Sequence, residues 1–478
     1  MVRAFALTET AQNATPREDS PHLKTVREQG ILARHNKVLP RIVPNRVGGG
    51  SVKKKVSLLA FVGALVAVAA VFAGLSGTAQ SASKVTALPS SSCGPIVYKG
   101  SGKPDFLIAS DLPLQGAIRK QTVQISRAMI WALQQKSFKA GNWKIGYQSC
   151  DDSTAQAGGW DTAKCATNGR LYATNTSVMA VVGTFNSGCA KIIVPILNRA
   201  HPGPLAMVSP ANTNPGLTKH WDPGEPQKYY PTGQRNYARV VATDDFQGPA
   251  DAMWSKSLGF KKVYVLNDKQ TYGFGVATTY KNAAKKLGIQ VVGFKGWDAK
   301  QSSYEALANA IKASGAQAVF LGGIACNNGA KLMQDIKSVA PKVKLQMPDG
   351  FSDPNANGAV GNGAYISVAG QPPKSLTGAG ATFIKQFGKQ IGASPNPYSQ
   401  YGAQAMQVML QAVAAGGGDR AKTTKAIFGI HISNGIIGNF TINSTGDINL
   451  TPITIYRQAG KQLVPVKTLI PSANLVGG

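Results

Sequence analysis

Four short segments of the chain place polar side chains where loops bind small ligands. They are residues 183–187 (GTFNS), 209–213 (SPANT), 268–272 (DKQTY) and 347–349 (MPD). The first two follow runs of small apolar and β-branched residues, which is typical of loops at the carboxyl ends of parallel strands. There the hydroxyls of Ser187 and Thr213, with backbone N–H groups at a helix start, can hold a carboxylate. Asp349 can supply the opposite charge for an ammonium group, so the pattern predicts a pocket for a zwitterion.

The same side chains also have ordinary structural roles. Ser187 and Thr213 could cap helices, Tyr272 could be a partly buried aromatic residue, and Asp349 before a glycine could belong to a turn. The prediction therefore depends on the four segments occurring together rather than on any one of them.

The elements that must position these loops alternate between strand and helix. We predict strands at 106–110, 143–148, 178–182, 205–208, 262–267, 290–294, 318–321 and 344–347. Helices are predicted at 122–134, 155–173, 190–198, 248–258, 272–287, 304–313 and 329–339. Such alternation produces parallel sheets with right-handed crossovers. The expected fold class is α/β, with two doubly wound parallel-sheet lobes joined by a multi-strand hinge.

The last part of the chain contains too few elements to bury a core of its own. Its predicted strands are 365–368, 440–442 and 453–458, and its predicted helices are 381–389 and 400–415. We expect these elements to return and complete the two lobes. The predicted boundaries are 1–52 for a leader of doubtful translation, 53–83 for a signal peptide, 84–103 for an N-terminal extension, 104–242 and 369–449 for lobe 1, and 243–368 and 450–478 for lobe 2, the last with a return strand and tail.

The composition limits the class of protein. The chain is 43% hydrophobic, which is enough to form a large core. Its 478 residues are too many for one compact unit. Its formal net charge is +29. The lysines and arginines are scattered, and no dense basic run beyond the leader is interleaved with aromatic residues, which argues against nucleic-acid binding. The charge is compatible with attraction to an anionic cell surface.

The N-terminal part indicates export. Three lysines at 53–55 precede an uncharged apolar stretch at 56–77, and small residues at 78–83 offer a cleavage site, which is the pattern of a secretory signal. The stretch is long enough to span a bilayer, so an uncleaved membrane anchor is the alternative. We infer that translation begins at Val52; a disordered cytoplasmic tail is the alternative for residues 1–51. The protein is expected in the periplasm or at the cell surface.

All five cysteines lie beyond the signal and would face an oxidising compartment. Cys150, Cys165 and Cys189 are the candidates for disulfide bonding, with a Cys165–Cys189 pair slightly favoured over a pair that uses Cys150. Cys93 is a poor lipid acceptor because it lacks the expected preceding aliphatic residue. Cys326 is expected to be a buried, unreactive thiol.

Several stretches in order along the chain carry a resemblance to a known family. They are residues 108–116 (IASDLPLQG), 150–153 (CDDS), 182–187 (VGTFNS), 209–213 (SPANT), 268–273 (DKQTYG), 348–350 (PDG) and 401–405 (YGAQA). With them, residues 103–469 resemble the leucine/isoleucine/valine-binding proteins, which are amino-acid receptors of ABC importers with a type I periplasmic-binding fold. The resemblance implies that Ser187, Thr213 and the backbone of Ala211 bind the ligand carboxylate. It also implies that Asp349 and Tyr272 bind the ammonium group.

The chain departs from this family around the ligand side chain. Ile324 stands where a tyrosine is common, and the family's glutamate is shorter here as Asp349. Ile118 and Arg119 are further candidates for the side-chain pocket, and an inward Arg119 would favour an acidic or polar ligand side chain. Relatives of this family also bind amides, urea and aromatic acids, which are the alternative ligands.

The expected function is capture of an amino acid between two closing lobes for delivery to the membrane permease subunits of an ABC importer. We expect a monomer that uses no cofactor and no metal. An enzyme is disfavoured because the few histidines form no metal-ligand pattern and the chain has no P-loop or G-x-S-x-G elbow. A membrane-anchored sensor with the same pocket is the alternative.

Overall fold

The computed structural model describes residues 85–477. The leader at 1–52, the signal peptide at 53–83 and the candidate anchor at 56–77 lie outside the described residues. Within residues 85–477, no helix combines the length and the apolar character needed to cross a membrane. Most strands of this part belong to two large sheets, which we call the first and the second sheet.

The first sheet has six strands in the order β2-β3-β1-β6-β7-β8. The strands are β1 (Phe106–Leu112), β2 (Lys139–Ala140), β3 (Trp143–Asp151), β6 (Val178–Gly183), β7 (Ala206–Ser209) and β8 (Tyr237–Arg239). All except β2 pair in parallel. Ile108 and Leu112 pack into one apolar cluster, and Leu107 and Ala109 into another. This is the pattern of a parallel sheet that is covered on both faces.

The second sheet has seven strands in the order β10-β9-β11-β12-β13-β16-β17. The strands are β9 (Lys262–Asn267), β10 (Gln290–Gly296), β11 (Ala318–Gly322), β12 (Lys344–Met347), β13 (Tyr365–Ala369), β16 (Ile453–Ala459) and β17 (Gln462–Leu469). The first five pair in parallel, and β16 and β17 form an antiparallel edge. The expected α/β class is confirmed, although neither sheet is purely parallel.

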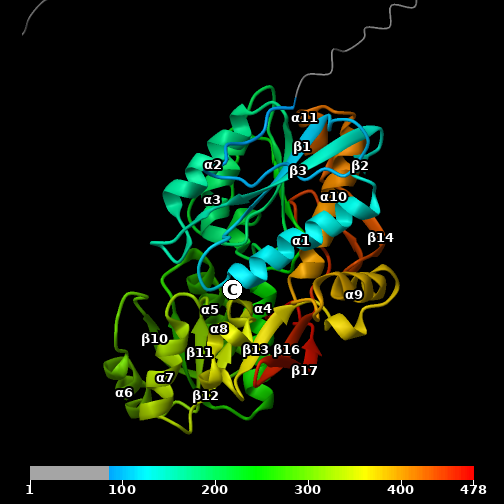
Figure 1. Ribbon diagram of the computed structural model, residues 1–478. Coiled ribbons are helices and arrows are strands. Elements are labelled where there is room, and N and C mark those ends of the chain that lie inside the picture. The colour runs from blue at the N-terminus through cyan, green and yellow to red at the C-terminus, as the bar shows by residue number, and fades with distance from the viewer. Residues whose placement is uncertain (1–84, 478) are drawn as a thin grey trace, which may run out of the picture. The chain divides into compact units, whose positions relative to one another are not determined.

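Pairs of helices cover the sheets. The helices are α1 (Arg119–Gln135), α2 (Thr162–Thr174), α3 (Ser187–Asn198), α4 (Asp244–Ser257), α5 (Thr271–Lys286), α6 (Glu305–Ala313), α7 (Gly329–Val339) and α10 (Ser399–Gly416). At the first sheet, α1 packs on α10, and α2 packs on α3 on the opposite side (Figure 1). At the second sheet, α4 packs on α5 and α6 packs on α7. The loops between these helices and the strands carry the predicted site residues.

The region after β13 differs in part from the prediction. It also contains α9 (Gly378–Ile391), α11 (Arg420–Ala426), β14 (His431–Gly435) and β15 (Gly438–Thr441). The strand expected at 440–442 falls in β15, which pairs with β14 in a separate two-stranded sheet instead of completing a large one. In contrast, the strand expected at 453–458 joins the second sheet as β16, next to β13.

The helix predicted at 155–173 is too long. A short hairpin of β4 (Ser153–Thr154) and β5 (Gly159–Trp160) occupies its first part. Two successive glycines stand in this segment, and glycine disfavours a helix interior. Gly158 adopts a φ of 67°, which suits the turn of the hairpin. Helix α2 then begins after Asp161, whose side chain accepts a hydrogen bond from the Lys164 backbone N–H at 2.9 Å.

Two disulfides stabilise the region around the first sheet. Cys165 pairs with Cys189, which is the pairing that the sequence slightly favoured. Cys150 pairs with Cys93 and thereby ties the N-terminal extension to β3. Cys326 is the free thiol of the described residues and is partly exposed, whereas we expected it to be buried. Desolvation nevertheless raises the pKa of the Cys326 thiol to about 12.

Candidate functional site

A cavity lies where loops of the first sheet meet loops of the second. It is lined by Phe185, Asn186, Ser187, Ala211, Tyr272, Ile324, Asp349 and Gly350. The first four follow β6 and β7, and the others follow β11 and β12 or begin α5. The cavity has a volume of about 20 Å³, which is room for about one water molecule. The structure thus brings five of the predicted residues to one place: Ser187, Ala211, Tyr272, Ile324 and Asp349.

One wall of the cavity is the start of α3. Ser187 is the first residue of this helix, and the Asn186 side chain before it makes no capping hydrogen bond. The first N–H groups of a helix lack acceptors within the helix and carry partial positive charge. The Ser187 hydroxyl oxygen accepts a hydrogen bond from the Asn214 backbone N–H at 3.3 Å, which holds the side chain in place. This wall is suited to an anionic group.

Thr213 lies two residues beyond Ala211 but does not line the cavity itself. Its side chain is fully buried, and its hydroxyl has no hydrogen-bond partner among the described residues. A buried hydroxyl without a partner is unfavourable. Thr213 therefore places a buried hydroxyl next to the wall that is suited to an anionic group.

The opposite wall carries Asp349. Tyr272 donates a hydrogen bond to Asp349 Oδ1 at 2.6 Å, and Tyr398 donates one to Asp349 Oδ2. The Tyr272 hydroxyl in turn accepts a hydrogen bond from the Gly350 backbone N–H at 3.2 Å. Burial raises the pKa of Asp349, and the two tyrosine hydrogen bonds act against this rise. The carboxyl group is thus shielded from water and fixed from two sides.

A second buried acid, Asp244, lies beside this site. It begins α4, and its backbone N–H donates to the Thr213 carbonyl at 2.9 Å. Both oxygens of its carboxyl group lack partners among the described residues. Burial raises the pKa of Asp244 well above its usual value, the nearby Thr213 hydroxyl acts against this rise, and the charge of Asp349 adds to it. Sequence reasoning did not assign Asp244 to the site.

Two predicted pocket residues lie elsewhere. Ile118 is buried at the start of α1, and Arg119, the first residue of that helix, is exposed. Neither lines the cavity. Sequence reasoning also missed Tyr398, whose ring meets Phe185 edge-on with the ring centroids 5.7 Å apart. Its position just before the 401–405 motif is the signal in the sequence that could have identified it.

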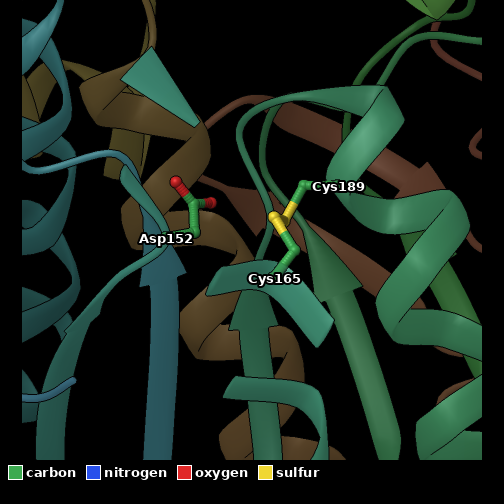
Figure 2. Close-up of side chains that lie close together, drawn as sticks. All are labelled: Asp152, Cys165 and Cys189. Carbon is green, nitrogen blue, oxygen red and sulfur yellow. A yellow bond between two sulfur atoms is a disulfide. The ribbon is translucent and has the colours of Figure 1, made fainter. Parts of the chain in front are cut away.

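Asp152, Cys165 and Cys189 form another group of close polar side chains (Figure 2). The two sulfurs are bonded to each other, so they are not thiolate ligands for a metal. The Asp152 carboxyl is fully buried and has no hydrogen-bond partner by geometry among residues 85–477, and burial, with the nearby Asp111, raises its pKa well above the usual value. Burial also raises the pKa of the neighbouring Asp111 to about 7. We interpret these acids as structural groups of the core.

The sequence profile of a family described as Periplasmic binding protein matches residues 113–462. The chain therefore belongs to this family, which implies an extracytoplasmic location. It is similar to Leu/Ile/Val-binding protein homolog 1 of Brucella abortus, with 25% identity over 370 residues, which cover 76% of this chain and 92% of the relative.

Solved structures share the fold. The leucine-binding protein LivK of Thermotoga maritima has a TM-score of 0.68 at 21% identity, over 77% of this chain and 99% of that chain. A solute-binding protein of an ABC transporter from R. palustris, solved with benzoate, has a TM-score of 0.65 at 17% identity, over 77% of this chain and 96% of that chain. Both likenesses support the two-sheet architecture described above.

Proposed function

We propose that this protein captures an amino acid outside the cytoplasm and delivers it to the permease subunits of an ABC importer. The observation that carries the proposal is the chemistry of the two cavity walls. The helix start at Ser187 faces one side of the cavity, and the buried carboxyl group of Asp349 faces the other. A zwitterion needs one subsite that binds its carboxylate and, close to it, another that binds its ammonium group. The helix start supplies the first and Asp349 the second.

In this proposal, Ser187, Thr213 and the backbone of Ala211 bind the carboxylate of the ligand. Asp349 and Tyr272 bind its ammonium group. Tyr398 joins them as a residue that orients Asp349, since its hydroxyl already donates to that carboxyl group. The buried hydroxyl of Thr213, which lacks a partner, supports a role in which the ligand supplies the missing hydrogen bond.

The ligand side chain is expected to be apolar. Phe185 and Ile324 are the apolar side chains of the cavity wall, and the exposed Arg119 does not reach it. The name of the Brucella abortus relative, a homolog of Leu/Ile/Val-binding protein, is consistent with a branched aliphatic ligand.

An aromatic acid is the second candidate ligand. Two tyrosine hydroxyls satisfy Asp349, so a ligand without an ammonium group would not leave this carboxyl group unpaired. The related structure that contains benzoate supports this alternative. Affinity for an amino acid relative to benzoate distinguishes the two candidates.

Binding requires the site to open, because the present cavity holds only about one water molecule and an amino acid is far larger. We propose a hinge movement of the two lobes, with Ser187 and Thr213 on one lobe and Tyr272 and Asp349 on the other. Ligand contacts made only in the closed state would shift the population towards it. The permease subunits would then recognise the closed form.

The proposed role is binding without catalysis. The residues that line the cavity include no histidine that could act as a general base beside the Ser187 hydroxyl. A membrane-anchored sensor with the same pocket is the alternative, and a mature N-terminus after the apolar stretch at 56–77 would argue against it.

The test is a calorimetric titration of the exported protein with leucine, isoleucine, valine and benzoate. Asp349→Asn should weaken amino-acid binding by roughly two to three orders of magnitude, because an ammonium group buried without its partner costs about 3–5 kcal/mol. Asp353→Asn is the matched control, since Asp353 caps the short helix α8 (Pro354–Asn357) and does not line the cavity. Unchanged amino-acid affinity of Asp349→Asn would contradict the proposal, as would benzoate binding more tightly than any amino acid.

A further inference from the structure

A second hollow lies at the opposite end of the second sheet from the ligand cavity. Its volume is about 150 Å³, and it is lined by Lys337, Lys344, Leu345, Asn362, Gly363, Ala364, Tyr365 and Arg457. Lys344 and Tyr365 are the first residues of β12 and β13, whereas Asp349 follows the other end of β12. We call this feature the basic hollow. Nothing in the proposed amino-acid site requires it.

The basic hollow has three cations and no carboxylate in its wall. None of the three, Lys337, Lys344 and Arg457, takes part in an ion pair within residues 85–477. The Lys337 ammonium donates to the backbone carbonyls of Pro341 and Val343 at 3.0 and 2.8 Å, as lysines at helix ends commonly do. Lys344 and Arg457 have no such structural role, so their positive charge is available to an anion.

Exposed apolar side chains adjoin the basic hollow. Arg457 on β16 pairs across the strands with Val464 on β17, and β17 is the edge strand of the sheet. Val464 and Val466 are each 46% exposed, and Ile470 just beyond the strand is 66% exposed. A cationic hollow beside exposed apolar residues is the combination that binds a membrane surface, where phosphate groups lie next to acyl chains.

The sequence of β17 argues against pairing with a second copy of the chain. An exposed edge strand can add another strand, but proline and lysine on the edge oppose this pairing. Pro465 and Lys467 occupy β17. The excess of Lys and Arg over Asp and Glu, 51 against 22 in the full sequence, also makes a second copy a poor partner and an anionic surface a favourable one.

We propose that the basic hollow and the neighbouring edge of β17 form a docking surface for anionic phospholipid. A lipid phosphate occupies the hollow between Lys344 and Arg457, and Val464 and Val466 contact the region below the headgroups. This contact is reversible and leaves the amino-acid cavity, at the other end of the strands, free to open.

The experiment is co-sedimentation of the exported protein with vesicles of phosphatidylglycerol or of phosphatidylcholine. We expect binding to phosphatidylglycerol that weakens with salt, and little binding to phosphatidylcholine. The double variant Lys344→Gln/Arg457→Gln should lose roughly thirtyfold in affinity for the anionic vesicles, since each cation near the surface contributes about 1 kcal/mol. Val464→Ser/Val466→Ser should also weaken binding.

The matched control is Lys385→Gln/Lys389→Gln, which removes two exposed lysines from α9 and changes the net charge equally. An equal loss in this control would overturn the proposal, because it would mean that only total charge matters. Inorganic phosphate that binds the hollow without competing with vesicles would also overturn it. A dimer in light scattering that Val464→Ser/Val466→Ser abolishes would assign the surface to a second copy instead. Circular dichroism checks that the variants fold. Amino-acid affinity should be unchanged in the variants of the basic hollow, which would show that the hollow and the ligand cavity act independently.

Discussion

The charge of Asp349 depends on two phenol hydroxyls that come from distant parts of the chain. Tyr272 begins α5, and Tyr398 precedes α10. Burial raises the pKa of the Asp349 carboxyl, and hydrogen bonds from these two tyrosines lower it again. The proposed ammonium subsite works only while this carboxyl group is ionised. At the scale of single residues, the tyrosines therefore set the pH range in which an amino acid binds.

Tyr398→Phe should shift the pH dependence of amino-acid binding. The variant removes one hydrogen bond that favours the ionised form, so the pKa of Asp349 rises and binding is lost at a higher pH than in the unaltered protein. A hydrogen bond to a charged group contributes roughly 1.5–3 kcal/mol, which corresponds to a shift of about one to two pH units. Titrations between pH 4 and pH 8 measure it.

Tyr401→Phe is the control for this shift, because the Tyr401 hydroxyl donates to the Ala369 carbonyl at 2.7 Å and does not contact Asp349. If Tyr398→Phe and Tyr401→Phe gave the same pH profile, Tyr398 would have no special influence on Asp349.

Individual elements show what could be predicted from the sequence and what could not. β9, α7 and β12 have the predicted bounds, because alternating or periodic apolar residues determine them locally. The helix predicted at 155–173 wrongly includes β5, because the apolar pattern of α2 continues across the two glycines before it. Sequence reasoning misses the contacts of Tyr398 and Asp244 because they join segments far apart in the sequence; for Tyr398, only its place just before the 401–405 motif hints at a role.

The disulfide of the N-terminal extension also joins residues that are far apart in the sequence. Cys150 was grouped with the two later cysteines because they are near in sequence, yet it pairs with Cys93, 57 residues away. Beside this bond, Val97 pairs with Tyr147 in an isolated antiparallel bridge. The extension thus adds to the edge of β3, although its sequence has no strand pattern.

Removing the Cys93–Cys150 bond should destabilise the whole described part of the chain. For a loop of this length, the loss of chain-entropy stabilisation amounts to about 4 kcal/mol. We expect Cys93→Ser/Cys150→Ser to lower the free energy of unfolding in urea by that amount, with Cys326→Ser as a control that changes it by less than about 1 kcal/mol. A loss in the double variant no larger than in the control would mean that the extension contributes little to stability.

The whole molecule combines a large positive charge with several buried acids. Acidification adds positive charge to a chain that already carries +29, and self-repulsion alone would destabilise it. The buried acids act in the opposite direction. Asp111, which accepts hydrogen bonds from Tyr172 and Asn168, has a pKa of about 7 instead of 3.8, mainly because of burial.

Stability should therefore fall as the pH rises from about 4 to about 7. The folded protein holds the Asp111 proton more tightly than the unfolded chain, so this contribution is complete below about pH 4 and is lost as the pH rises through about 7. One such group changes the free energy of unfolding by at most about 1.4 kcal/mol per pH unit. Asp111→Asn, which cannot ionise, should show a smaller decline in urea unfolding at several pH values. Greater stability of the unaltered protein at pH 8 than at pH 5 would contradict this prediction.

The closing movement is the other property of the whole molecule. If the two sheets approach each other around the ligand, small-angle X-ray scattering should give a smaller radius of gyration when a saturating amino acid is added. Asp349→Asn should show no change at the same concentration. An unchanged profile for the unaltered protein, together with calorimetric binding, would indicate that ligand enters without lobe movement.

The free thiol of Cys326 affects how long the protein keeps its disulfide pairing outside the cytoplasm. A free thiol in a protein with two disulfides can attack them and scramble the pairing, and the attacking species is the thiolate. Desolvation raises the pKa of the Cys326 thiol to about 12, so the reactive thiolate is strongly disfavoured at neutral pH. Desolvation thus slows disulfide shuffling, so the unpaired cysteine does not endanger the bonds at Cys93 and Cys165.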